Sequence, residues 1–109
     1  MKNNMDYNQI KIGGTIVYAN VNSTRITLRV ECKYYLTEDM YETNTFLVEA
    51  SPTIFLNDEA STLKDGEYVH VEGHIRTMPF AIIPEGYATG GVLVADTIKV
   101  QEDEEEQEA

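Results

Sequence analysis

The sequence predicts an all-β fold in the form of a small barrel of five strands. Two segments, residues 25–35 and 67–77, alternate between apolar and polar side chains, which is the pattern of a half-buried strand. The other β-rich segments are residues 10–21, 43–50 and 92–100. Only residues 53–64 have helical character, and it is weak. Five short strands separated by turn signals are typical of a barrel or a sandwich.

The first two strands are predicted to form a hairpin. Gly13 and Gly14 interrupt the first strand, which indicates a bulge or a sharp bend between two sheets. The sequence from Asn20 to Ser23 then supplies a turn. Five side chains of the second strand are expected to face the core: Ile26, Leu28, Val30, Cys32 and Tyr34.

The rest of the barrel is predicted around one short helix. The third strand ends before Pro52, the helix follows over residues 53–64, and Gly66 allows the turn into the fourth strand. Within that strand, Gly73 permits a close backbone approach or a bulge. A loop over residues 78–91, rich in glycine and large apolar residues, leads to the last strand.

This order of elements matches one architecture. Three strands, a short helix and two strands form a five-stranded Greek-key barrel of the OB type, in which the helix lies between strands three and four and plugs the barrel. Another small β-barrel or a β-sandwich is the alternative. We assign residues 1–9 to a polar N-terminal arm, 10–100 to the OB-fold domain and 101–109 to a disordered acidic tail.

The charge is negative and concentrated at the C-terminus. The 109 residues carry a formal net charge of -11. Six acids and no base lie in residues 101–109, so eight bases and thirteen acids remain in the rest of the chain, a net charge of -5. A body of this charge argues against general binding of duplex DNA, which depends on a basic surface. Any nucleic-acid site must therefore be a local basic face.

Cysteine content and hydropathy indicate a reduced, intracellular protein. Cys32 is the single cysteine, so no internal disulfide can form. The polar residues 1–9 lack the apolar segment of a signal peptide, and no apolar run approaches the roughly 18 residues that cross a bilayer. We therefore expect a cytoplasmic protein with no membrane partner.

Two segments resemble the bacterial and phage single-stranded DNA-binding proteins. Residues 63–77, Leu-Lys-Asp-Gly-Glu-Tyr-Val-His-Val-Glu-Gly-His-Ile-Arg-Thr, are similar to the turn and fourth strand of that family. Residues 92–100 resemble the family's closing strand, and an acidic tail is a third shared trait. The resemblance implies an OB-fold protein that binds single-stranded DNA largely independently of sequence. It also implies protection of that DNA in replication or recombination, in a bacterial cell or a phage-infected host, by a homodimer or homotetramer.

A row of basic residues on the second strand is the first candidate site. Arg25, Arg29 and Lys33 recur every four residues on one face, about 13 Å apart, with Tyr35 at the end of the row. Proteins that bind single strands combine such a track with aromatic rings on which the bases stack. An ordinary solvated strand face is the alternative. The residues predicted to contact single-stranded DNA are Arg25, Arg29, Lys33, Tyr35, Tyr41, Arg76, Phe80 and Tyr87.

Two further apolar features have more than one interpretation. Phe46 shares a face with Val48 and Ala50, which favours packing in the core over base stacking. The loop over residues 78–91 could fold over single-stranded nucleic acid, pack against a second subunit or cover the end of the barrel.

No catalytic or metal site is predicted. His70, Glu72 and His74 alternate along one strand face, but two histidine Cα atoms about 13 Å apart are too distant for one ion with bonds of roughly 2 Å. No nucleophile motif or phosphate-cradling loop is present in the sequence. We therefore expect neither an enzyme nor a cofactor.

The acidic tail is predicted to contact basic proteins. Its six carboxylates should stay solvated, and they could recruit basic replication or recombination proteins or cover the basic groove of the same domain. A solubilising end is the simpler alternative. The six are Glu102, Asp103, Glu104, Glu105, Glu106 and Glu108. For the whole chain, the alternative function is an OB-type protein-interaction module without nucleic-acid binding.

Overall fold

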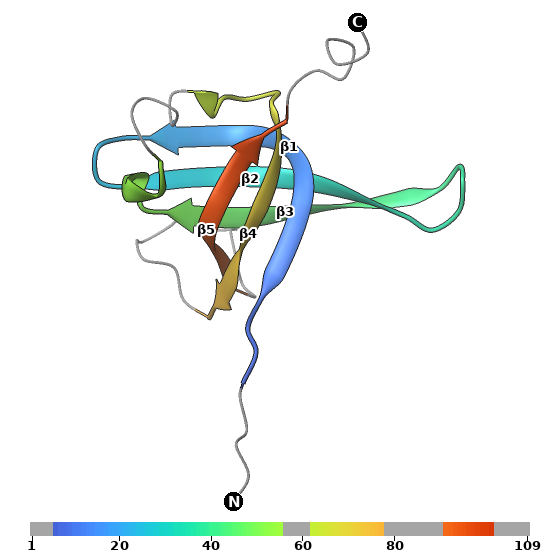
Figure 1. Cartoon of the computed structure of the whole chain (residues 1–109). Helices are drawn as coiled ribbons and strands as arrows, with labels where there is room; N and C mark the ends of the chain where they lie inside the picture. The colour runs from blue at the N-terminus through green and yellow to red at the C-terminus, as the bar shows by residue number, and fades with distance from the viewer. Residues whose placement is uncertain (1–5, 56–61, 78–90, 102–109) are drawn as a thin grey trace, which may run out of the picture.

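The chain forms a closed barrel of five strands (Figure 1). This computed structural model describes residues 6–55, 62–77 and 91–101. The strands are β1 Ile10–Val21, β2 Ile26–Tyr35, β3 Tyr41–Ala50, β4 Tyr68–Arg76 and β5 Val92–Val100. They follow the order β1-β2-β3-β5-β4 around the barrel, and β4 closes on β1. Neighbours are antiparallel apart from β3 and β5, which are parallel, so the predicted Greek-key barrel is confirmed.

The barrel interior is filled by the apolar side chains that alternate along the strands. Ile26, Leu28 and Val30 of β2 are completely buried, and so are Val69 and Val71 of β4. Successive side chains of a strand point to opposite faces, so one face of each strand enters the core and the other meets solvent. The two alternating segments of the sequence therefore line the same core.

β1 bends so that it can pair with two strands. Its first half pairs with β4, and from Thr15 onward it pairs with β2. A side chain at Gly14 would collide with the carbonyl oxygen of Glu31, so a glycine is needed where β2 approaches the bend. The predicted bulge is not at Gly13 or Gly14, which stay in the strand; the β1–β2 register shifts at Val17 instead.

The helix between β3 and β4 is shorter than predicted. Among the described residues after β3, a 3-10 turn, η1 Pro52–Ile54, is followed by extended backbone at Phe55. Ser51 caps the turn, because its hydroxyl oxygen accepts a hydrogen bond from the backbone N–H of Thr53 at 3.2 Å. A continuous helix from Thr53 is therefore wrong, and residues 56–61 lie outside the described part. No helix within the described ranges is long and apolar enough to cross a membrane.

The β2–β3 hairpin continues beyond the barrel as a projecting arm, residues 32–44 (Figure 1). β1 leaves β2 after the pair formed by Thr15 and Glu31, whereas β2 and β3 stay paired to the ends of both strands. Tyr34 was predicted to face the core, and this is wrong, since 63% of it is exposed. It lies on the same face of β2 as the core residues, but the strand has left the barrel at this point.

Gly73 marks the tightest contact between β4 and β5. The register of this pair shifts between Glu72 and Gly73, which leaves Asp96 as an extra residue on β5. A Cβ atom at Gly73 would collide with the carbonyl oxygen of Val94. The close approach predicted for this glycine is therefore confirmed.

Candidate nucleic-acid interface

The outer face of β2 carries the predicted basic row. Arg29 and Lys33 lie on the strand, Tyr35 ends it, and Arg25 lies one residue before it. Because every second side chain of a strand shares a face, these four lie on one side of β2, and the row runs from the barrel into the arm. The structure thus brings together the residues that the four-residue spacing predicted.

The arm groups Lys33 with two tyrosines. Tyr35 and Tyr41 lie opposite each other, with ring centroids 5.2 Å apart and planes tilted by 49°. The Lys33 ammonium lies 4.9 Å from the centroid of the Tyr41 ring, which is a cation–π distance. Both rings are open to solvent, since 58% of Tyr35 and 47% of Tyr41 is exposed. The arm therefore presents a positive charge that can bind a phosphate, next to two aromatic rings on which bases can stack.

Tyr18 belongs to the same surface, although the sequence did not reveal it. It lies opposite Arg29 in the β1–β2 pair, and the guanidinium carbon of Arg29 is 5.5 Å from its ring centroid. Simple alternation would place Tyr18 on the core side with Ile16. The bulge at Val17 turns it outward, where 41% of it is exposed. No pattern in the sequence marks this bulge, because the glycines that indicate one lie elsewhere.

Arg25 and Arg29 occupy the barrel end of the row. The side-chain oxygen of Asn22 accepts hydrogen bonds from the backbone N–H groups of Thr24 and Arg25, both at 2.9 Å, and so fixes the turn before β2. Both arginines are half-buried, whereas Lys33 is exposed. Lys33 is therefore the more accessible of these cations to a phosphate.

Arg76 lies on the same outer surface, three strands away from Arg29. It pairs with Val92 across β4 and β5, and Arg29 pairs with Leu47 across β2 and β3. In the parallel pair of β3 and β5, Val48 lies opposite Leu93. The same register places the preceding residues, Leu47 and Val92, beside each other. Neighbouring strands are about 4.8 Å apart, which puts the two arginines about 14 Å apart along the curved surface. One cross-strand row therefore contains both.

Two of the predicted contact residues, Phe80 and Tyr87, lie outside the described residues. The same is true of most of the loop 78–91, whose three possible roles stay predictions. The six carboxylates of the tail are also outside the described ranges. For these residues the sequence remains the only basis for a role.

His70 of β4 has two partners within the protein. The Nε2 atom of His70 is 2.8 Å from the side-chain oxygen of Gln101. The His70 ring also meets the ring of Tyr68 edge to face, with centroids 5.4 Å apart. Within the described part of the chain, no three His, Cys, Asp or Glu side chains are grouped so that they could hold a metal ion.

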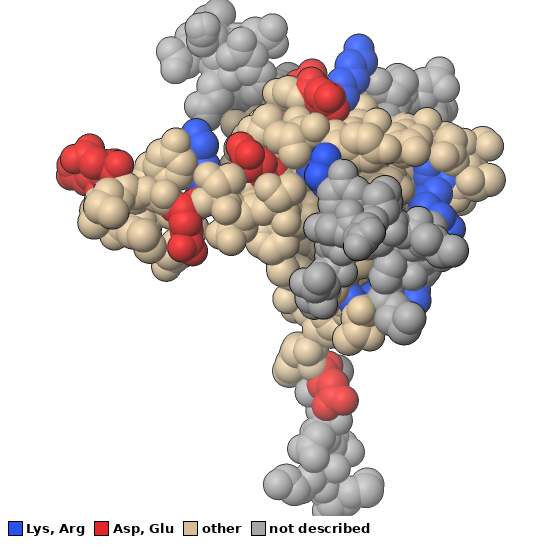
Figure 2. All heavy atoms as spheres, turned by 180° about the vertical axis from the view of Figure 1, so that it is seen from behind, with Lys and Arg blue, Asp and Glu red and all other residues tan. Residues whose placement is uncertain are grey.

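Charge is unevenly spread over the surface (Figure 2). In this view most of the basic side chains lie over the barrel, and the far end of the projecting arm is acidic. Glu38 and Asp39 form this tip, where the hydroxyl of Thr37 accepts hydrogen bonds from the backbone N–H groups of Asp39 at 3.3 Å and Met40 at 3.1 Å. A polyanion therefore fits the barrel and the base of the arm better than the tip.

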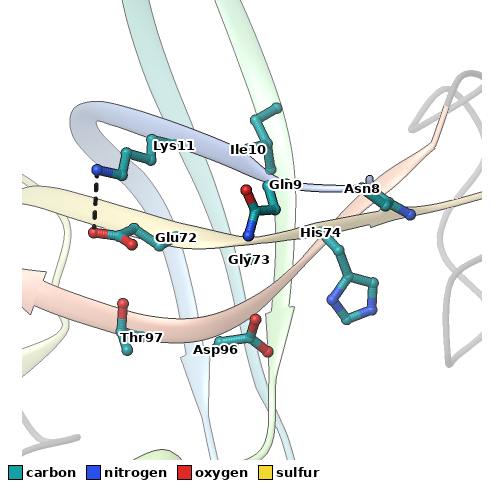
Figure 3. Close-up of a pocket in the computed structure, with 9 residues that line it drawn as sticks. All are labelled: Asn8, Gln9, Ile10, Lys11, Glu72, Gly73, His74, Asp96 and Thr97. Carbon is teal, nitrogen blue, oxygen red and sulfur yellow. Dashed lines mark ion pairs between the residues drawn. The ribbon is translucent and has the colours of Figure 1, made fainter. Parts of the chain in front are cut away.

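A separate groove of about 650 Å³ lies where the N-terminal segment and the start of β1 run alongside β4, and β5 also lines it (Figure 3). The Asn8 amide anchors this segment, since it donates to the carbonyl of Ile75 at 2.9 Å and accepts from its N–H at 2.8 Å. Lys11 pairs with Glu72 at 3.9 Å, and Asp96 adds a second carboxylate. Acids outnumber lysines in this groove, so the surface of β1, β2 and β3 suits phosphates better.

Cys32, at the base of the arm, should react slowly with thiol reagents at neutral pH. Burial raises the pKa of its thiol, and the Glu31 carboxylate raises this pKa further. The reactive thiolate is therefore scarce until the pH passes the ordinary thiol range. Iodoacetamide alkylation rates, measured against pH in the folded protein and in urea, should give a folded curve displaced to higher pH. Coincident curves would contradict this prediction.

The architecture defines the class of the protein. A closed barrel in the order β1-β2-β3-β5-β4, with a helical turn between β3 and β4, is an OB-fold. The predicted fold class is therefore confirmed. In this class the surface of strands two and three binds oligonucleotides and oligosaccharides, and the basic and aromatic side chains lie on this surface here.

Several solved structures share this fold at low sequence identity. A small single-stranded DNA-binding protein from Streptomyces coelicolor has a TM-score of 0.61 at 19% identity, over 90% of this chain and 96% of that one. The dimeric N-terminal domain of PriB from Thermoanaerobacter tencongensis has a TM-score of 0.61 at 18% identity, over 88% and 98% of the two chains. The S. pombe Stn1–Ten1 complex has a TM-score of 0.58 at 16% identity; the match covers 93% of this chain but 63% of that one, less than two thirds. No family model and no curated protein matches the sequence.

Proposed function

We propose that this protein binds single-stranded DNA, with little sequence preference, on the outer face of β1, β2 and β3. The observation that carries the proposal is the pairing of basic and aromatic side chains along that face. Arg29 lies 5.5 Å from the Tyr18 ring, and Lys33 lies 4.9 Å from the Tyr41 ring. Cations neutralise phosphates, and an exposed ring can stack on any unpaired base. A duplex offers no such free base faces, which favours a single strand.

The proposed contacts divide by chemistry. The residues that meet phosphates are Arg25, Arg29, Lys33 and Arg76. The residues that stack on bases are Tyr18, Tyr35 and Tyr41, with Phe80 and Tyr87 added from the sequence alone. Structural neighbours that are themselves named single-stranded DNA-binding proteins, from Streptomyces coelicolor and Mycoplasma pneumoniae, support single-stranded DNA as the ligand.

In the cell, the protein would protect single-stranded DNA during replication or recombination, as a binding protein and not an enzyme. We place it in the cytoplasm of a bacterium or a phage-infected host. A homodimer or homotetramer is part of the proposal, and the dimeric PriB neighbour supports it. The six acidic residues of the tail, residues 102–106 and 108, would recruit basic partner proteins and cover the basic face when no DNA is bound.

A titration with oligo(dT), followed by tyrosine fluorescence, tests the proposal. Stacking should quench the fluorescence, and binding should weaken as salt rises, by roughly 0.7 log units per neutralised phosphate for each log unit of salt. Replacing both Arg29 and Lys33 by glutamine should reduce that slope by about 1.4. The control variant replaces Lys64 and Lys99 by glutamine. It loses the same amount of positive charge, but from positions outside the basic row of β2.

The alternative function gives a different result. A protein-interaction module without nucleic-acid binding would show no change in fluorescence even at low salt. That outcome would contradict the proposal. If the variant that lacks Arg29 and Lys33 binds DNA with an unchanged salt slope, the protein binds DNA, but these two residues do not contact its phosphates. The binding face would then lie elsewhere on the barrel.

A further inference from the structure

A second groove opens where β1 and the arm separate. Beyond the pair formed by Thr15 and Glu31, β1 continues beside β4 while β2 continues beside β3, so β1 and β2 diverge. The space between them is a groove of about 440 Å³, which we call the fork groove. Tyr34 and Phe46 line it, and they lie on the opposite face of the hairpin from Tyr35.

The floor of the fork groove is apolar and deepens toward the barrel. Phe46 is half-buried and pairs with Val30, which is completely buried. Cys32 is half-buried and comes next along β2, and Tyr34 stands at the exposed outer end. Two rings and a thiol therefore line a slot that leads from solvent to the core. Such a slot suits a flat ligand with apolar faces.

The β1 side of the fork groove offers backbone groups. Lys11, Ile12 and Gly13 line this side. Here β1 pairs with β4 on one edge, and β2 joins its other edge only from Thr15 onward. The peptide groups on that second edge therefore face the groove rather than a strand, and can hydrogen-bond to the polar edge of a ligand.

Two polar side chains of β3 complete the lining. Glu42 and Asn44 lie opposite Tyr34 and Cys32 respectively. A carboxylate only accepts hydrogen bonds, so Glu42 favours a ligand that presents an amino group. Cytosine carries an amino group at the position where thymine carries a carbonyl oxygen. Asn44 can both donate and accept, so it discriminates less between the two bases.

Positive charge stands at the rims of the fork groove. Lys11 and Lys33 line its two sides; the Lys11 ammonium is 3.9 Å from the Glu72 carboxylate, and the Lys33 ammonium is 4.9 Å from the centroid of the Tyr41 ring. A nucleotide whose base enters the groove would therefore leave its phosphate beside a lysine. Lys33 also belongs to the face proposed to bind DNA, so the two surfaces are continuous at this residue.

We propose that the fork groove is a nucleobase subsite that prefers cytosine to thymine. The inference rests on the proposed function, because a base reaches the groove as part of a bound strand. That strand passes over the edge of the arm at Lys33, so rings on both faces of the arm contact bases. A second copy of this chain is the other occupant that the open edge of β1 could accept, and the experiments below distinguish the two.

Base preference is the first test. Anisotropy of a labelled thymine oligomer, and of the same oligomer with central cytosines, should show about fivefold tighter binding of the second, the effect of one added hydrogen bond. Glu42→Gln should abolish the preference, and Glu38→Gln, which removes the same charge at the tip, should keep it. Equal affinities, or a preference that survives Glu42→Gln, would overturn the subsite and leave the proposed function intact. If neither oligomer binds, both proposals fail.

Protection of Cys32, the single cysteine of the chain, is the second test and uses the unaltered protein. At alkaline pH, a saturating cytosine-bearing oligomer should slow its alkylation about fivefold or more, because Cys32 lines the groove and a bound base would cover its thiol. An unchanged rate, with saturation verified by anisotropy, would overturn the subsite. Protection that grows with protein concentration in the absence of DNA would show a second copy in the groove and would overturn it as well.

Discussion

Replacing both Tyr35 and Tyr41 by alanine should weaken the binding of oligo(dT) by at least about 30-fold. The two rings form the exposed pair on the arm, and stacking contributes about 1–3 kcal/mol per base, so losing both removes about 2–6 kcal/mol. The Lys33 charge is retained in this variant. The salt dependence of binding should therefore keep its slope while the affinity falls.

Anisotropy of a labelled oligonucleotide at fixed salt measures this loss without relying on tyrosine fluorescence. Tyr7→Ala is the matched control, because Tyr7 is 81% exposed and lies before β1, away from the arm. The control should bind as the unaltered protein does. If the double variant also binds with unchanged affinity, the arm does not contact the bases.

Replacing Gly73 by alanine should lower the free energy of unfolding by about 3 kcal/mol or more. The added methyl group would meet the carbonyl oxygen of Val94 and the Cα atom of Ala95, which are backbone atoms of β5 and cannot rotate away. The two strands would have to separate at the bulge. Because this pair helps to close the barrel, the effect should reach the whole fold.

Urea denaturation followed by circular dichroism measures the effect of Gly73→Ala. Gly66→Ala separates steric collision from backbone strain, since Gly66 has a φ of 94° but an open space around its Cβ position. Its cost should be about 1 kcal/mol, that of a left-handed backbone alone. Equal losses for the two variants would show that the Gly73 contact is relieved by a small shift of β5.

The strands were predictable because each has one face in the core. β1 and β5 have the predicted bounds, and β2 and β4 differ from them by one residue at most at each end. In β4 the valines and Gly73 alternate with polar residues, and Gly66 fixes the turn before them. A pattern with period two therefore located these strands and the basic row of β2.

Other parts of the site depend on structural features that the alternation of apolar and polar residues does not predict. Tyr18 faces outward because a bulge shifts the register of β1, and Tyr34 is exposed because β2 extends past the end of the barrel. Phe46, expected in the core, is half-buried because it lines the fork groove, where β1 and β2 diverge. The pattern gives the face of a residue, but it does not tell where the barrel ends along the strand.

The shared row of Arg29 and Arg76 was beyond prediction for another reason. It depends on the parallel contact between β3 and β5, which are separated by more than forty residues in the chain. No local pattern encodes such a contact, because each strand is amphipathic whichever neighbour it has. The spatial relation between the two arginines therefore required the three-dimensional structure.

The projecting hairpin also separates recognition from folding. The core that stabilises the domain lies inside the barrel, whereas the rings and charges of the arm point into solvent. Mutations in the hairpin can thus alter ligand choice with little change in the free energy of folding. Natural selection or protein design could diversify the specificity of this small scaffold one side chain at a time.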